Sequence, residues 1–286
     1  MSVRGTTRVC GVWGWPVKHS ASPAMHNAAF AELGVDLIYV PFAVSPERLP
    51  EAVASIRALD LLGVNITVPL KELVPPLLDR LTARAARLGA VNTIFWEGSQ
   101  LCGDSTDGPG ILAALSSEGV VVDTNTKAVV LGAGGSARAV VDALVQAGAH
   151  VLVANRTTER AQELVARFGA AGALPLEAKA LRTALKTANL LLNTTSIGMH
   201  PRETELPPVP PEALHSGIFV SDLIYNPVET GLLTIARQAG CRTQNGIEML
   251  VQQGAIAQKY WTGMPAPLKI MRHAVQQALG IADRMV

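Results

Sequence analysis

Cysteine is scarce in this sequence. Its three residues, Cys10, Cys102 and Cys241, lie far apart, and no CxxC pair or Cys/His spacing accompanies them. We therefore expect neither a disulfide framework nor a zinc site, and no metal site of another kind is indicated. A reducing cytosol is the compartment that suits this use of cysteine.

An excess of charge is also lacking, as are long hydrophobic runs. The 24 Lys and Arg almost balance the 23 Asp and Glu, for a formal net charge of +1, so no broad field favours nucleic acid or an anionic membrane. No run of about 18 apolar residues occurs, and no apolar stretch with a cleavage site opens the chain. We expect a cytoplasmic protein that binds small molecules. The sequence does not determine the oligomeric state, and a homodimer stays an open expectation.

Short apolar runs, by contrast, are abundant, since 49% of the residues are hydrophobic. In the first part of the chain they alternate with segments of helical periodicity. Strands are expected at 9–15, 37–44, 61–68 and 90–96. Helices are expected at 23–34, 46–58, 77–88 and 109–118. This alternation predicts an α/β fold with a largely parallel sheet.

A second α/β series begins after the polar stretch VVDTNTK at 121–127, which is a candidate domain boundary. Its strands are expected at 128–131, 150–154, 189–193 and 218–223. Its helices are expected at 135–147 and 158–168. This series predicts a Rossmann-like half. The helical stretch 246–280 has no following strand and could pack back on the first domain.

Glycines mark the turn from the first of these strands into its helix. In VVLGAGGSARAVVDAL, Gly132, Gly134 and Gly135 would let the backbone turn tightly and approach a pyrophosphate, while the helix N-terminus offers free N–H groups. Ala137 takes the place of the third glycine of the usual fingerprint, as a small residue can. A Gly-rich turn with a purely structural role is the alternative.

The next strand ends in Asn155-Arg156-Thr157, and Arg160 follows. An NAD-binding domain usually carries an acidic residue near this point to bind the ribose 2′-hydroxyl. An uncharged side chain with two arginines suits a 2′-phosphate instead, since guanidinium binds phosphate bidentately. NADP is therefore favoured over NAD, although Thr157 could simply cap a helix between solvated arginines.

Polar residues at element ends form a candidate substrate site. Ser20 and Ser22 precede Pro23. With Ser22 as a natural N-cap, both hydroxyls would lie near the positive end of a helix dipole, where a carboxylate could dock. Capping alone would explain one of the two serines.

Asn65, Thr67 and Lys71 lie at the end of another expected strand, the edge at which α/β proteins usually bind ligands. Asn92 lies within the next expected strand, and Asp107 stands directly before a glycine and a helix. Taken singly, Lys71 could be a solvated charge and Asp107 a helix cap.

The order of these motifs resembles that of the shikimate dehydrogenase family. Ser-x-Ser-Pro, Asn-x-Thr-x-Pro-x-Lys, Ala-Val-Asn-Thr and Thr-Asp-Gly are followed by Gly-Ala-Gly-Gly and Asn-Arg-Thr-x-x-Arg. Further matches begin at Asn193, Asp222 and Gly246, so the resemblance spans roughly residues 11–280. One departure is Ser105, where the family commonly has Asn before Thr-Asp-Gly.

The resemblance implies a substrate-binding domain at 1–107 plus 243–286 and an NADP-binding Rossmann domain at 108–242. It also implies that Ser20 and Ser22, assisted by Tyr225, hold a substrate carboxylate. The residues implied around the ring hydroxyls are Thr67, Lys71, Asn92, Asp107 and Gln253. The residues implied at the cofactor are Gly132, Ala133, Gly134, Gly135, Ser136, Asn155, Arg156, Thr157, Arg160, Leu223 and Gly246.

The implied activity is reversible hydride transfer between NADPH and C3 of 3-dehydroshikimate, which gives shikimate for aromatic amino acid biosynthesis. Lys71 is the candidate donor that stabilises and protonates the developing oxyanion, with Asp107 holding its geometry. A quinate/shikimate dehydrogenase with dual substrate use is the nearest alternative. A glutamyl-tRNA reductase would need a catalytic cysteine near its N-terminus and a longer chain, and a regulatory module without turnover would be expected to lack Lys71 or Asp107.

Overall fold

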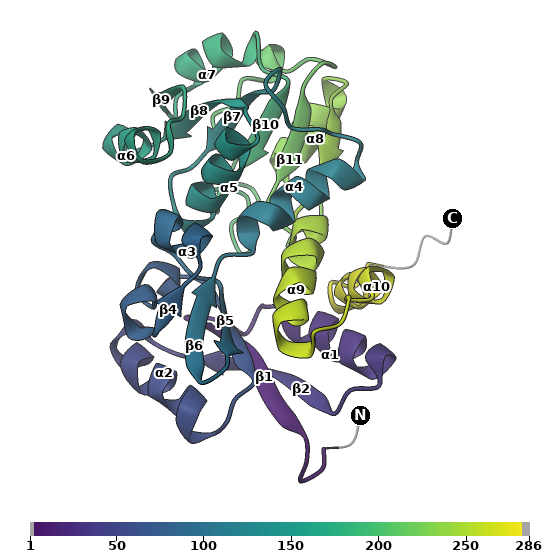
Figure 1. The fold of residues 1–286 in the computed structure, drawn as a ribbon. Helices are drawn as coiled ribbons and strands as arrows, with labels where there is room; N and C mark the ends of the chain where they lie inside the picture. Colours follow the sequence, from purple (N-terminus) through teal and green to yellow (C-terminus); the bar gives the residue numbers. More distant parts are fainter. Residues whose placement is uncertain (1–2, 282–286) are drawn as a thin grey trace. The chain divides into compact units, whose positions relative to one another are not determined.

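The computed structural model describes residues 3–281 and divides the chain into two compact units. Unit 1 takes the chain up to Gly110 and again from Leu250 onward, and unit 2 is Ile111–Met249. Each unit has its own six-stranded sheet (Figure 1). The predicted α/β class with a Rossmann-like half is confirmed.

The sheet of unit 1 has the strand order β2-β1-β3-β5-β6-β4. Its strands are β1 (Arg8–Gly14), β2 (Leu37–Ala43), β3 (Gly63–Ile66), β4 (Arg80–Leu81), β5 (Thr93–Glu97) and β6 (Gln100–Asp104). Strand β1 is parallel to β2 and β3, and β4 is parallel to β6, but β5 is antiparallel to both of its neighbours. The sheet is therefore mixed rather than largely parallel. The difference comes from the β5–β6 hairpin, whose turn uses Gly98 in a left-handed conformation (φ 63°).

The helices of unit 1 come from both ends of the chain. They are α1 (Ser22–Leu33), α2 (Leu49–Ala58), α3 (Ala83–Leu88), most of α9 (Ile247–Thr262) and α10 (Leu268–Ala278). Helix α10 packs along α1 (Figure 1). Trp261 of α9 donates a hydrogen bond to the carbonyl of Ile94 at 3.1 Å. The C-terminal helices thus complete the unit that the N-terminal part begins.

The expected helix at 77–88 is wrong over its first half. Residues Pro75–Leu77 form a 3-10 turn and β4 follows, so α3 begins only at Ala83. The backbone is extended at Leu78 (φ −102°, ψ 153°), and the hydroxyl of Thr82 accepts from the amide of Ala85 as a local cap. Together these features move the start of the helix past Thr82.

The core of unit 1 lies on both faces of its sheet. Successive side chains of β1 enter different hydrophobic clusters. Val12 belongs to a cluster that contains Phe30 and Tyr39, whereas Trp13 belongs to a cluster that contains Ile56. This division follows from the alternation of side chains along a strand. All four residues of β3 are buried, as expected for a strand covered on both faces.

Unit 2 is a parallel sheet of strand order β12-β11-β10-β7-β8-β9. Its strands are β7 (Lys127–Leu131), β8 (His150–Asn155), β9 (Gly172–Pro175), β10 (Leu190–Asn193), β11 (Phe219–Asp222) and β12 (Arg242–Gln244). Its helices are α5 (Gly135–Gln146), α6 (Thr158–Phe168), α7 (Ala178–Leu185) and α8 (Gly231–Gln238), and α4 (Asp107–Ser117) leads into it. The strand order reverses between β7 and β10, which is where doubly wound sheets bind ligands.

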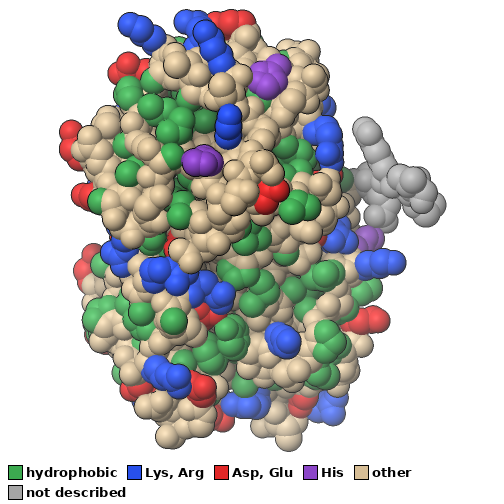
Figure 2. Space-filling model, turned by 45° about the horizontal axis from the view of Figure 1, so that its top comes forward, with side chains coloured by type: hydrophobic (Ala, Val, Ile, Leu, Met, Phe, Trp, Pro, Cys, Tyr) green, Lys and Arg blue, Asp and Glu red, His purple; other side chains and the backbone are tan. Residues whose placement is uncertain are grey.

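The surface is mixed in charge. On the face drawn in Figure 2, Lys and Arg side chains are interspersed with acidic and hydrophobic ones, and no broad field of one sign covers it. None of the helices within residues 3–281 combines the length and the apolar character that crossing a bilayer requires.

Candidate active site

Lys71 and Asp107 form an ion pair in unit 1. Lys71 lies in the 3-10 turn Leu70–Glu72 that follows β3, and Asp107 is the first residue of α4. The Lys71 ammonium lies 2.6 Å from a carboxylate oxygen of Asp107, and the two side chains are only 13% and 7% exposed. Lys71 is thus not a solvated surface charge. Its ammonium has three N–H donors and uses one on Asp107, which leaves donors for a ligand.

Asn92 and Gln253 extend this pair into a network. The side-chain amide of Asn92 donates to the second carboxylate oxygen of Asp107 at 2.8 Å and lies 3.3 Å from the side-chain oxygen of Gln253. The side-chain oxygen of Asn92 accepts from the backbone amide of Thr106 at 2.8 Å. Asn92 directly precedes β5 instead of lying inside it, and Gln253 comes from α9. Four of the expected substrate residues are therefore in one cluster.

Three further polar residues join the network, none of them in the set that the family resemblance implies at the substrate. The Asn65 amide donates to the backbone carbonyl of Asn92 and to the Thr93 hydroxyl, both at 3.1 Å. The phenol of Tyr39 donates to the Asn65 carbonyl oxygen at 2.7 Å. Tyr39 stands in an apolar strand and gave no signal in the sequence, whereas Thr93 stood in the Ala-Val-Asn-Thr motif and Asn65 in the Asn-x-Thr motif.

Ser20 and Ser22 lie at the start of α1. The predicted N-cap at Ser22 is wrong, because the helix begins there and Ala21 holds the cap position. The backbone of Ala21 is already close to helical (φ −82°, ψ −5°), so the helix starts one residue before the prediction. The Ser20 hydroxyl instead accepts from the Ser22 amide at 3.3 Å. Ser22 is 8% exposed.

Thr67 lies in the same loop as Lys71. Its backbone amide donates to the carbonyl of Trp13 at 2.8 Å. Its methyl group lies 2.4 Å from the position that a Cβ on Gly14 would take. Within residues 3–281 the Thr67 hydroxyl has no hydrogen-bond partner. It is therefore available to a ligand.

The glycine turn of unit 2 has the geometry of a phosphate site. Gly132 follows β7 with φ 107°, and a Cβ there would meet the Thr194 hydroxyl at 2.7 Å. Gly134 is the N-cap of α5, no side chain caps the helix, and a Cβ at Gly134 would find open space. The first amides of α5 are therefore available to an anion. Ala137 is fully buried, as the small third position of the fingerprint requires. Ala133 and Ser136 lie in the same turn.

The end of β8 has no acidic residue. Asn155 is its last residue and donates to the Thr157 carbonyl at 2.8 Å. Thr157 holds the N-cap position of α6, but its side chain makes no capping hydrogen bond. Arg156 and Arg160 are exposed. An exposed pair of guanidinium groups beside an uncharged amide fits a phosphate better than a ribose hydroxyl alone.

Leu223, Tyr225 and Gly246 lie past the carboxyl ends of β11 and β12. The Gly246 amide donates to the carbonyl of Ile224 at 2.9 Å, and a Cβ at Gly246 would lie 2.1 Å from the Leu223 carbonyl oxygen. Only glycine allows this close approach of two backbones. Tyr225 belongs to unit 2, whereas Ser20 and Ser22 belong to unit 1.

Asp222, which ends β11, holds this segment in place. Its carboxylate accepts from the Asn193 amide, the Ile224 backbone amide and the Thr230 hydroxyl, at 3.0, 3.1 and 2.8 Å. All three partners are uncharged. Burial therefore dominates and raises the pKa of Asp222 to about 6.

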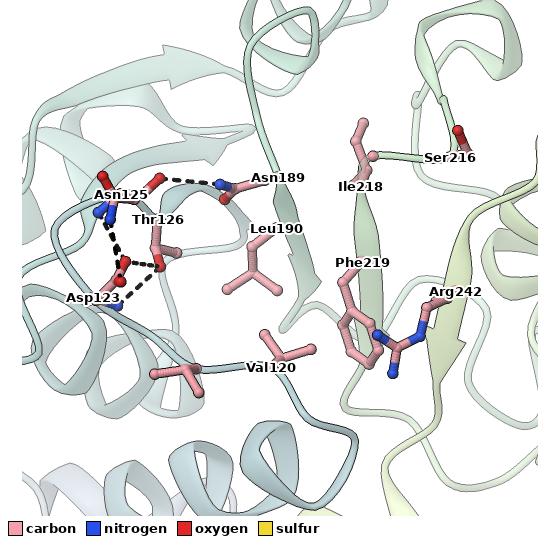
Figure 3. Close-up of a pocket in the computed structure, with 12 residues that line it drawn as sticks. Val120, Asp123, Asn125, Thr126, Asn189, Leu190, Ser216, Ile218, Phe219 and Arg242 are labelled. Carbon is pink, nitrogen blue, oxygen red and sulfur yellow. Dashed lines mark hydrogen bonds between the residues drawn. The ribbon is translucent and has the colours of Figure 1, made fainter.

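A hollow of about 360 Å³ in unit 2 lies away from the glycine turn (Figure 3). It opens at the amino ends of β7, β10, β11 and β12, whereas the glycine turn follows the carboxyl end of β7. Its polar side chains bond to their own neighbours: Asp123 accepts from the Asn125 amide, and Asn189 donates to the Asn125 carbonyl. We do not assign a ligand to it.

Comparison with known proteins finds matches along nearly the whole chain. Residues 12–94 match the shikimate dehydrogenase substrate binding domain, residues 117–201 match shikimate / quinate 5-dehydrogenase, and residues 246–276 match the shikimate 5'-dehydrogenase C-terminal domain. The chain is 46% identical over 290 residues to shikimate dehydrogenase (NADP(+)) of Moorella thermoacetica, covering 99% of this chain and 97% of that protein.

Solved structures give the same result. The shikimate 5-dehydrogenase of Thermus thermophilus, in complex with NADP(H) and shikimate, is 38% identical with a TM-score of 0.88, covering 96% of this chain and all of that one. Quinate dehydrogenase from Corynebacterium glutamicum, in complex with NAD, is 30% identical with a TM-score of 0.85, covering 95% and 99%. With such identity over nearly its full length, the chain belongs to the shikimate dehydrogenase family.

Proposed function

We propose that this protein catalyses the reversible, NADP-dependent interconversion of shikimate and 3-dehydroshikimate. The observation that supports this most directly is the ammonium of Lys71, held 2.6 Å from Asp107 inside a nearly buried polar network with donors to spare. A carbonyl reduction needs such a donor, because negative charge develops on the oxygen as hydride reaches the carbon.

The substrate is a carboxylate with ring hydroxyls, and unit 1 offers groups for both. Ser20 and Ser22 would bind the carboxylate with the help of Tyr225. The ring hydroxyls would be bound by Thr67, Asn92, Asp107 and Gln253. The free hydroxyl of Thr67 and the spare donors of Lys71 support this assignment, since each can bind a ligand without breaking a bond in the fold.

In the reduction, Lys71 donates a hydrogen bond to the carbonyl oxygen and then transfers a proton to it. Asp107 keeps the ammonium oriented. In the reverse reaction it accepts a hydrogen bond from the reacting hydroxyl. Asn92 fixes the other oxygen of Asp107, so the carboxylate cannot turn away. Such positioned proton transfer accelerates a reaction by about 10² to 10⁴-fold.

Unit 2 fits NADP, which supplies the hydride when bound. The pyrophosphate would lie at the glycine turn, on the first amides of α5, beside Gly132, Ala133, Gly134, Gly135 and Ser136. Asn155, Arg156, Thr157 and Arg160 would bind the 2′-phosphate, since the end of β8 offers no carboxylate to repel it. Leu223 and Gly246 would line the nicotinamide.

On this proposal residues 1–107 with 243–286 form the substrate-binding domain and 108–242 the NADP-binding domain. The protein would act in the cytoplasm within aromatic amino acid biosynthesis, and a homodimer is the assembly to test by light scattering.

A quinate/shikimate dehydrogenase is the second candidate, because the NAD-bound quinate dehydrogenase is 30% identical. The decisive experiment follows reduced cofactor by absorbance with shikimate or quinate and with NADP or NAD. We expect rapid reduction with shikimate and NADP. No shikimate-dependent reduction would overturn the proposal, and equal rates with quinate would favour the second candidate.

A further inference from the structure

Asn193 links two loops of unit 2 that the proposed cofactor would contact. It ends β10, is fully buried, and is not among the residues assigned to substrate or cofactor. Strand β10 lies between β7 and β11, at the point where the strand order reverses. The glycine turn follows β7 and Leu223 follows β11. Asn193 therefore stands between the proposed pyrophosphate and nicotinamide ends of the site.

On the side of β11, Asn193 holds Leu223 through both its main chain and its side chain. The Leu223 amide donates to the Asn193 backbone carbonyl at 3.0 Å. The Asn193 side-chain amide donates to a carboxylate oxygen of Asp222 at 3.0 Å, and the same oxygen accepts from the Ile224 amide at 3.1 Å. Asp222 and Ile224, which flank Leu223, are thus joined at the oxygen that Asn193 binds.

On the side of β7, the residues after Asn193 pack on the glycine turn. The Thr194 amide and hydroxyl both donate to the carbonyl of Leu131, at 2.9 and 2.6 Å. A Cβ at Gly132 would lie 2.7 Å from the Thr194 hydroxyl oxygen and 3.1 Å from the Thr195 methyl group. The Asn193 side-chain oxygen accepts from the amide and the hydroxyl of Thr195, at 3.1 and 2.7 Å. One side chain therefore ties the loop that packs on Gly132 to the carboxylate that anchors the loop after β11.

The orientation of the Asn193 amide group is determined by its partners. Its oxygen must face the Thr195 backbone amide, which can only donate. Its nitrogen therefore faces Asp222. An ionised carboxylate in its place would keep the acceptor for Thr195 and lose the donor to Asp222.

We propose that Asn193 is a positioning residue that sets the place of Leu223, at the nicotinamide, relative to the glycine turn, at the pyrophosphate. The inference rests on the proposed function. NADP would span the two loops, and a displacement of about 1 Å between reacting groups can lower the rate about 10²-fold. Asn193 gives no group to the reaction and acts through the loops on either side of it.

The test is Asn193→Asp, which replaces the donor to Asp222 by a second carboxylate. We expect kcat to fall about tenfold or more at about pH 9, because Leu223 is then displaced. With NADPH deuterated at the transferred position, the isotope effect on kcat should rise, since hydride transfer limits the rate more. Adenosine 2′,5′-bisphosphate lacks the nicotinamide, so its Kd should stay within about twofold of wild type.

Lowering the pH should restore much of the lost kcat. Two carboxylates this close share a proton, and the protonated one donates to the other as the Asn193 amide does in wild type. Thr195, Ile224 and Thr230, which also bond to this pair, are uncharged. We expect the kcat of the variant relative to wild type to rise from about pH 9 to about pH 6. The same deficit at both pH values would mean damaged packing and would overturn the positioning role.

Asn189→Asp is the matched control, because Asn189 directly precedes the same strand at its other end. Its side chain donates to the Asn125 carbonyl at 3.0 Å and accepts from the Lys127 amide at 2.9 Å. The kcat of this variant should stay within about twofold of wild type at both pH values. Equal kcat losses in Asn189→Asp and Asn193→Asp would overturn the inference.

Thr195→Val tests the same link without a second buried carboxylate, should Asn193→Asp fail to fold. It removes the hydroxyl that donates to the Asn193 oxygen and accepts from the Ile197 amide. We expect kcat to fall about three- to tenfold with the Kd of the bisphosphate unchanged. An active wild type and an equally active Thr195→Val would overturn the inference alone. A wild type that binds NADP but does not turn over shikimate would overturn the proposed function, and this inference with it.

Discussion

At the scale of single residues, the structure distinguishes charges that keep hydrogen-bonding capacity for a ligand from charges that only hold the fold. Lys71 and Asp107 are nearly buried, yet their network leaves donors unused. Asp104 is fully buried, but Thr82, Arg84 and Tyr260 all bond to it. A carboxylate whose partners satisfy it completely stabilises structure, whereas an ammonium with spare donors can act on a ligand.

Replacing the ammonium should therefore affect turnover more than binding. We expect Lys71→Ala to lower kcat by about 10² to 10⁴-fold with little change in the KM for shikimate. Because the change leaves the Asp107 carboxylate without its cation, the melting temperature should also fall. Lys259→Ala, which removes an exposed lysine of α9, is the control and should change neither quantity. A kcat within about threefold of wild type would contradict the role of Lys71.

Asp222 should give stability a pH dependence of a definite sign. Its folded-state pKa is raised from 3.8 to about 6, so the group favours the folded state fully below pH 3.8 and this contribution is lost as the pH rises through 6. Because asparagine does not titrate, Asp222→Asn does not lose stability in this way as the pH rises. Relative to wild type, we expect the variant to gain about 2 kcal/mol between pH 4.5 and 7.5. Urea unfolding at both pH values measures it, and a constant difference between the proteins would refute the shift.

At the scale of elements, the loops after β11 and β12 are held together by a close approach of their two backbones. Gly246 approaches the Leu223 carbonyl so closely that no side chain fits, while its amide binds the next carbonyl of the same loop. Asp222 anchors that loop from the other side by binding the Ile224 amide and Thr230. The loop position is therefore determined by this backbone contact together with the carboxylate of Asp222.

Gly246→Ala should displace this loop. A Cβ 2.1 Å from a carbonyl oxygen forces the backbone to move, at a cost of about 1 to 3 kcal/mol in unfolding free energy. If Leu223 lines the nicotinamide, the KM for NADP should rise more than the KM for shikimate. Gly5→Ala, where a Cβ meets nothing within 4 Å, controls for the effect of alanine on the unfolded chain. Equal stability of both variants would show that the crossing is not tight.

At the scale of the whole molecule, one unit is continuous in the chain and the other is not. Unit 2 is made from Ile111–Met249 alone, but unit 1 needs residues from Leu250 onward. Ala257 and Trp261 of α9 belong to the same core cluster as Phe30 and Tyr39. Removing the last helices would expose this cluster to water.

Truncation should therefore separate the two units in behaviour. We expect a fragment of residues 107–249, which keeps α4 whole, to unfold cooperatively and to bind NADP without turning over shikimate. A fragment of residues 1–110 should lack a cooperative transition, because α9 and α10 are missing. Circular dichroism melts of each fragment, with cofactor titration of the first, measure this. A cooperative melt of residues 1–110 would contradict the role given to α9 and α10.

Prediction from the sequence succeeded where the signal is local. The strand, glycine turn and helix at β7 and α5 follow from apolar periodicity and the needs of a tight turn. It missed β9, α7, α8 and β12, which are short: β9 begins with Gly and ends with Pro, and β12 is the polar triplet Arg242–Gln244. The place of β9 and β12 in the sheet comes from neighbouring strands, which a local pattern does not record.

The chain's own chemistry was determined by the sequence: an NADP-type strand end at Asn155, a glycine turn at Gly132, and a lysine, an aspartate and two serines in the order of one family. Only the tertiary structure decided which of them meet. Lys71 and Asp107 are 36 residues apart, and Asn92 and Gln253 are 161 apart. Tyr39 looked like an ordinary strand residue until folding set its phenol 2.7 Å from the side-chain oxygen of Asn65. The physical reason is that hydrogen bonds act over about 3 Å in space, whatever the separation along the chain.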